Sequence, residues 1–97
     1  MVVIKDLYRQ VTRAKRKYIL AQGPLAQTVS HFWLMIWEQN SETIIMLNKI
    51  IENNEIKCHW YWPDQNGEIK RFEFPDVNIA VIQLSEEDRT YYIIRKF

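Results

Sequence analysis

The spacing of apolar residues predicts one main helix near the middle of the chain. From Val29 onward, large apolar side chains recur every three or four residues, which would bury one broad stripe of a helix: Phe32, Trp33, Ile36 and Trp37. Thr28, directly before this run, is a suitable N-cap. Residues 38–41 are polar, so we expect the helix to end there.

Alternating or continuous apolar runs predict about five to six strands around this helix: residues 17–22, 43–47, 56–62, 68–74, 77–84 and 90–97. The run at 43–47 is continuous and β-branched, as in a strand that is buried on both faces, so we expect it to be the central strand. The pair Asn66-Gly67 predicts a tight turn with positive φ. Residues 85–89 are charged and are expected to form another turn.

Residues 1–16 fit two structures. Val3, Leu7, Val11 and Ala14 recur at helical spacing, which favours a helix. The apolar residues 2–4 could equally begin a strand.

Composition places the chain among ordinary globular proteins. Its 97 residues are 47% apolar and 26% charged, which suits one folded domain over residues 1–97 and argues against general disorder. We therefore expect a mixed α/β (α+β) fold in a twisted mixed sheet, with residues 1–16 as a basic N-terminal segment and residues 17–97 as the core.

The near-neutral total charge of +1 hides an uneven distribution. Residues 1–17 hold six basic side chains and one acidic one, a net charge of +5, whereas the remaining residues hold seven basic and eleven acidic ones, a net charge of −4. Such a basic segment either binds an anionic or phosphorylated partner or is a solvated face. The candidate anion-binding residues are Arg13, Lys15, Arg16 and Lys17. Nucleic acid is a poor candidate ligand, because the segment lacks interleaved aromatic residues beyond Tyr8.

The chain has a single cysteine, Cys58, and therefore no internal disulfide. Its first ten residues contain no signal-peptide core, and no apolar run approaches the ~20 residues of a membrane span. These features predict a soluble protein of the cytoplasm. His31 and His59 have no second pair of ligands at zinc spacing, so we expect neither a metal nor a cofactor.

Four motifs resemble the domain of the protein tyrosine phosphatases in order and spacing. They are residues 22–25 (QGPL), residues 32–39 (FWLMIWEQ), residues 44–47 (IIML) and residues 57–63 (KCHWYWP). The resemblance covers about residues 17–97, which implies a truncated phosphatase domain made of its N-terminal and central parts. The amino-acid sequence of these motifs is most similar to that of the phosphatases carried by the bracoviruses of parasitoid wasps. This similarity would make the chain a viral protein that acts in the host cytoplasm.

The resemblance also implies a catalytic loop, but the sequence motif of that loop does not occur in this chain. The family hydrolyses phosphotyrosine with a nucleophilic cysteine in a His-Cys-x5-Arg loop, where backbone amides and the arginine hold the phosphate. Cys58 is preceded by Lys57 and followed six residues later by Asp64. We therefore expect Cys58 to be a buried strand thiol and the protein not to be an enzyme, with no catalytic residues.

The sequence Trp62-Pro63-Asp64 is identical to the tripeptide of the family's general-acid loop. Its position argues against that role, because the tripeptide completes the earlier motif that begins at Lys57. We expect Asp64 to be a turn residue.

A partial phosphatase sheet should leave an apolar face or an unpaired edge uncovered. We therefore predict a homo-oligomer or a protein partner that covers it, with Trp60, Trp62, Phe72 and Phe74 as candidate interface residues. The resulting functional prediction is an inactive phosphatase-like protein that acts through protein–protein interaction, as a viral virulence or host-regulatory factor. Two alternatives stay open: an active phosphatase whose cysteine loop comes from another chain, and an adaptor whose basic segment binds a phosphorylated or acidic ligand.

Overall fold

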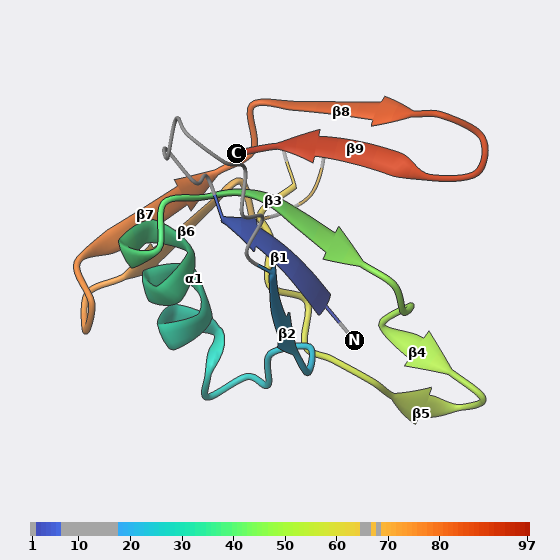
Figure 1. The fold of residues 1–97 in the computed structure, drawn as a ribbon, viewed down its shortest axis with the longest axis horizontal. Helices are drawn as coiled ribbons and strands as arrows, with labels where there is room; N and C mark the ends of the chain where they lie inside the picture. The colour runs from blue at the N-terminus through green and yellow to red at the C-terminus, as the bar shows by residue number, and fades with distance from the viewer. Residues whose placement is uncertain (1, 7–17, 65–66, 68) are drawn as a thin grey trace, which may run out of the picture. The chain divides into compact units, whose positions relative to one another are not determined.

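The computed structural model describes residues 2–6, 18–64, 67 and 69–97 (Figure 1). These residues form two compact units, Met1–Trp60 and Tyr61–Phe97, which are described separately. The expected single domain over residues 1–97 stays a prediction.

The first unit contains an antiparallel sheet of three strands, β1 (Val2–Asp6), β2 (Tyr18–Ala21) and β3 (Ser41–Met46), in the order β2-β1-β3 (Figure 1). Ile4 lies opposite Ile19 on one side and Ile44 on the other. Val2 and Ile4 are fully buried. The core of the sheet is therefore built around β1.

The sequence left residues 1–16 open between a helix, which it favoured, and a strand beginning at residues 2–4. The strand alternative holds from Val2 to Asp6, because the amides and carbonyls of this segment pair with strands on both sides. Another prediction at this sheet is wrong. The central strand is β1 and not residues 43–47, and Ile45 on β3 is exposed. The rest of the predicted N-terminal helix, residues 7–16, lies outside the described residues.

Helix α1 runs from Val29 to Glu38 as predicted and buries Val29, Phe32 and Trp33. Thr28 stands at the N-cap position, but its hydroxyl makes no capping bond. It accepts from the Leu25 N–H at 2.9 Å and donates to the Leu25 carbonyl at 3.2 Å, so it closes the turn before the helix instead. The buried stripe is narrower than predicted, since Trp37 is exposed.

A short hairpin of β4 (Ile51–Glu52) and β5 (Glu55–Ile56) follows the sheet. Asn53 and Asn54 form its turn with φ of 51° and 63°. The strand predicted for residues 56–62 is mostly absent. The backbone instead turns to loop partners: Lys57 N–H bonds to the Ile50 carbonyl at 2.7 Å, and His59 N–H bonds to the Pro24 carbonyl at 2.8 Å.

The second unit contains two antiparallel hairpins. One pairs β6 (Arg71–Phe74) with β7 (Ile79–Ile82), and the other pairs β8 (Ser85–Asp88) with β9 (Ile93–Lys96). The prediction of a charged turn at residues 85–89 is wrong for Ser85–Asp88, because an ion pair between Glu86 and Arg95, which lie opposite each other, lets this acidic segment pair as a strand.

The turn predicted at Asn66-Gly67 forms in part. Gly67 N–H bonds to the Asp64 carbonyl at 3.1 Å, but Gly67 does not have a positive φ. Asn66 lies outside the described residues. The described residues with positive φ are, instead, four asparagines and one threonine: Asn40, Asn53, Asn54, Asn78 and Thr90.

These elements confirm a mixed α+β fold, with one helix and nine short strands in the described part of the chain. The described strands form four small antiparallel sheets and not one mixed sheet of five or six strands. Within the described residues no helix has the length and apolar character needed to cross a membrane.

Candidate functional site

An open groove of about 470 Å³ lies in the first unit, and we call it the Gly23 groove. One side comes from the end of β2 and the loop that follows it, and the other comes from the segment around the β4–β5 hairpin. Its lining residues are Leu20, Ala21, Gln22, Gly23, Leu25, Asn48, Glu52 and Lys57. Two of the motifs seen in the sequence, residues 22–25 and 57–63, therefore meet here.

Gly23, a lining residue of the groove, packs on Cys58. Both residues are buried, and Cys58 is 0% exposed. A Cβ on Gly23 would overlap the Cys58 Cβ and lie 3.2 Å from Sγ, so only glycine fits at this position without a shift. The Pro24 carbonyl accepts from the His59 N–H, which fixes the two segments side by side.

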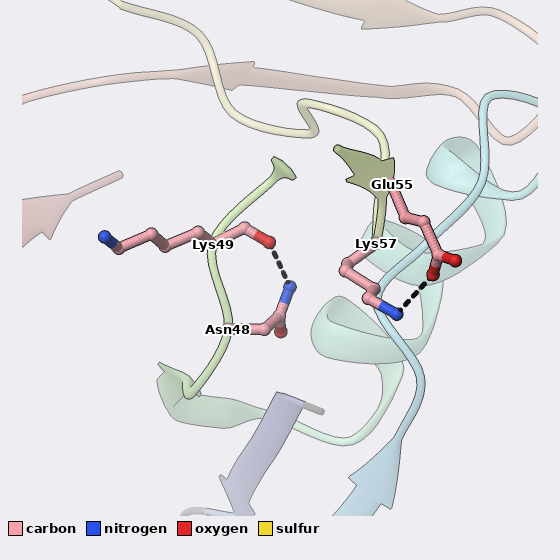
Figure 2. Close-up of polar contacts among 4 residues, drawn as sticks. All are labelled: Asn48, Lys49, Glu55 and Lys57. Atoms are coloured by element: carbon pink, nitrogen blue, oxygen red, sulfur yellow. Dashed lines mark hydrogen bonds and ion pairs between the residues drawn. The ribbon is translucent and has the colours of Figure 1, made fainter. Parts of the chain in front are cut away.

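The polar rim of the groove is largely paired within itself (Figure 2). Lys57 Nζ lies 2.9 Å from Glu55 Oε2, and Asn48 Nδ2 donates to the Lys49 carbonyl at 2.9 Å. Glu52 Oε1 accepts from the Lys49 N–H at 3.1 Å. Because the Lys57–Glu55 pair is well exposed to solvent, it contributes little stability and can be opened by a competing ligand.

Cys58 is buried and lies beside a neutral amide. A cysteine nucleophile must reach its substrate as a thiolate, usually beside a positive charge or a base. Cys58 has no exposed surface, and Asn48 Nδ2 approaches its Sγ at 3.7 Å as a neutral amide donor. Cys58 is therefore a buried thiol, as predicted, although it lies in a loop and not in a strand.

Asp64 lies in a turn, as predicted. Its N–H bonds to the Ile69 carbonyl at 3.0 Å and its carbonyl accepts from the Gly67 N–H. Among the residues that the structure describes, no three His, Cys, Asp or Glu side chains gather in a way that could hold a metal ion.

The predicted anion-binding residues Arg13, Lys15, Arg16 and Lys17 all lie outside the described residues. Their role stays a prediction.

The predicted interface residues differ in exposure. Trp60 is exposed, and Phe72 and Phe74 are half-buried with their rings edge to face at 6.0 Å. Trp62 is only 8% exposed, because its ring packs against Tyr61 at 5.0 Å and lies under the Arg95 guanidinium at 4.8 Å. Trp62 thus offers little surface to a partner in this structure, whereas an interface role for the other three stays a prediction.

Sequence reasoning missed most residues of the groove, notably Leu20, Asn48 and Glu52. The sequence contained only indirect evidence for the groove. Gly23 and Cys58 each belong to a recognisable motif, but nothing in their spacing shows that these motifs touch.

Comparison with known proteins places these motifs in a family. The family described as protein-tyrosine phosphatase matches residues 4–97. The chain is 48% identical over 88 residues to the tyrosine-protein phosphatase non-receptor type 61F of Drosophila melanogaster, covering 91% of the chain and 16% of that protein. It is 42% identical over 84 residues to the human tyrosine-protein phosphatase non-receptor type 2, covering 87% of the chain and 20% of that protein.

A receptor-type relative is also similar over a shorter stretch. The human receptor-type tyrosine-protein phosphatase epsilon is 57% identical over 53 residues, which is 55% of the chain and 8% of that protein. The chain therefore spans a fifth or less of the length of these three relatives. On the family match over residues 4–97, this chain belongs to the protein-tyrosine phosphatase family.

Proposed function

We propose that this 97-residue chain is a catalytically inactive, phosphatase-like protein that acts by binding other proteins. The observation that carries the proposal is the state of Cys58, the single cysteine of the chain, which is fully buried under Gly23. Phosphotyrosine hydrolysis in this family needs a thiolate that can contact phosphorus. Residue 64, six positions after Cys58, is an aspartate and not the arginine of the phosphate loop.

A binding function is supported by the apolar side chains that the structure leaves in solvent. Trp37 at the end of α1 and Ile56 on β5 are largely exposed, the latter by 78%. Ile51 lies opposite Ile56 across the hairpin and is also exposed, so the two form an apolar pair on its surface. Exposed apolar groups gathered in this way commonly mark protein-interaction surfaces. The proposed partner is a second copy of the chain or another protein.

Hydrolysis of para-nitrophenyl phosphate by the purified chain tests the catalytic part of the proposal. We expect no release of nitrophenol above the rate of buffer alone, because Cys58 cannot reach the substrate. Turnover that disappears in Cys58→Ser would overturn the proposal. Circular dichroism of the variant shows whether such a loss reflects chemistry or unfolding.

A narrower form of the proposal states where the protein acts and in what role. It acts in the cytoplasm of a host cell as a viral virulence or host-regulatory factor and competes with an active phosphatase for its protein partners. This form rests on the resemblance to bracovirus phosphatases. Capture of an active phosphatase's known binding proteins by the chain, with displacement of that phosphatase, would support it, and binding without displacement would contradict it.

A further inference from the structure

We propose that Tyr91 is a phosphate-acceptor site for a tyrosine kinase. Tyr91 lies in the turn between β8 and β9 and is 95% exposed. The other tyrosines with a described side chain are less accessible: Tyr92 is 61% exposed, Tyr18 is 50% exposed and Tyr61 is 4% exposed. This site lies outside the Gly23 groove, and the inference does not depend on whether the chain is catalytically active.

The backbone next to Tyr91 is held in an unfavourable conformation. Thr90 has a φ of 73°, which is an outlier for a β-branched residue because its side chain crowds the backbone there. The Thr90 N–H bonds to Asp88 Oδ1 at 2.9 Å, and the Arg89 N–H bonds to the Tyr92 carbonyl at 2.9 Å. A kinase must open this turn to hold the backbone on both sides of the acceptor. Release of the strain at Thr90 favours that opening.

Acidic residues precede the tyrosine at short distances along the chain. Glu86, Glu87 and Asp88 lie five, four and three residues before Tyr91. Glu86 is already paired with Arg95 at 2.8 Å across the hairpin. Glu87 pairs with Arg89 at 2.8 Å, with both side chains about half-exposed, so this second ion pair is weak and can be exchanged. The segment can therefore present negative charge to a kinase whose substrate groove is basic, which favours encounter and sets register.

The reaction is a phosphoryl transfer from ATP. The Tyr91 hydroxyl oxygen forms a bond to the γ-phosphorus as the bond from that phosphorus to the β-phosphate oxygen breaks. ADP leaves, and the hydroxyl proton passes to the kinase's catalytic base. The phosphate adds a charge of about −1.5 to −2 and three strong acceptors to the Tyr91 side chain. Phosphorylation would thus create an exposed ligand for domains that bind phosphotyrosine through arginine.

The test is phosphorylation of the full 97-residue chain by the catalytic domain of a non-receptor tyrosine kinase with ATP and Mg²⁺. Orthovanadate is included to block phosphatases, so the readout does not depend on the proposed lack of activity. Peptide mapping by mass spectrometry locates the phosphate. We expect Tyr91 to carry most of it, Tyr91→Phe to lose most of the incorporation, and the matched control Tyr92→Phe to keep it.

Two further variants test separately whether the acidic segment and the strain at Thr90 promote phosphorylation of Tyr91. Glu87→Gln should slow phosphorylation of Tyr91 about twofold if the acidic segment guides the kinase, and it leaves the Glu86–Arg95 pair and the hydrogen bond from Thr90 N–H to Asp88 in place. Thr90→Asn should slow it about two- to fivefold, because asparagine adopts positive φ with less strain. Unchanged rates in these variants would overturn the respective causes. Equal labelling of Tyr91 and the buried Tyr61, or undiminished incorporation in Tyr91→Phe, would overturn the site itself.

Discussion

Gly23 and Cys58 show how strongly a single pair of residues can determine the local structure. The two lie far apart in sequence, yet Cys58 occupies the space that a side chain at position 23 would need. Interiors are close-packed, so an added methyl group at such a contact forces neighbouring atoms to move. The contact between the two segments therefore requires a residue without a side chain at position 23.

Gly23→Ala should therefore destabilise the protein by about 1–3 kcal/mol through overpacking against Cys58. The midpoint of urea unfolding, followed by tryptophan fluorescence, measures the loss. The matched control is Gly67→Ala, whose new Cβ would lie 3.2 Å from the Asp64 Cβ, a contact that needs a shift of only a few tenths of an ångström and not the removal of an overlap.

A second variant identifies the atom responsible. Because the overlap is with Cβ, Cys58→Ala should not restore the stability of Gly23→Ala, whereas Cys58→Gly should restore part of it. Equal rescue by both would show that the sulfur is the obstacle and would contradict the packing described here.

At the scale of elements, the contacts that hold the β8–β9 hairpin together contribute unequally to its stability. Arg95 joins β9 to β8 through Glu86 at 2.8 Å and also covers the Trp62 ring. Its side chain is partly buried, which strengthens both interactions relative to exposed pairs. Arg89 pairs with Glu87 nearer the turn, where both side chains are about half-exposed.

Arg95→Ala should lower the free energy of unfolding by about 1–2 kcal/mol, since it removes a cation–π contact and a partly buried ion pair together. Arg89→Ala is the control and should cost under about 0.5 kcal/mol. Urea unfolding in low and high salt measures both. Equal losses for the two variants would mean that the contact with Trp62 contributes nothing.

The elements also show what sequence reasoning could reach. The helix was predictable because its apolar spacing reports a buried face directly, and its start after Thr28 was correct. For residues 2–6 the pattern allowed both a helix and a strand, and the choice depends on partners at Tyr18–Ala21 and Ser41–Met46 that the local pattern does not reveal. Strand β8 was missed for a similar reason, since its acidic residues indicate a turn locally and its pairing with Ile93–Lys96 is not visible in the local pattern.

The candidate site, too, could be predicted from the sequence only in part. The motifs that contain Gly23 and Cys58 could be recognised from the sequence, and the buried thiol was predicted because the residues around Cys58 do not match the family's cysteine loop. The contact between them could not, because it depends on tertiary hydrogen bonds such as that from His59 N–H to the Pro24 carbonyl.

At the scale of the whole molecule, the chain combines a small set of buried residues with many exposed apolar ones. Fully buried apolar side chains include Val2, Ile4 and Cys58, whereas Leu20, Trp37 and Ile56 are largely in solvent. Burying such groups against a partner would remove apolar surface from water and favour association.

The solution mass by light scattering should accordingly be at least twice that of one chain at micromolar concentration and should fall on dilution. The physical reason is burial of the exposed apolar surface, so added salt should not weaken the assembly as it would a purely ionic contact. A mass of one chain at every concentration would contradict self-association and leave a different protein as the partner.

The asparagines with positive φ have a consequence for the unfolded chain. In the described part, the left-handed positions at 40, 53, 54 and 78 are asparagines, and neither glycine has a positive φ. Glycine would fit these turns as well, but it gives the unfolded ensemble more conformations to lose. By turning the chain with asparagine, the sequence lowers the entropy lost on folding.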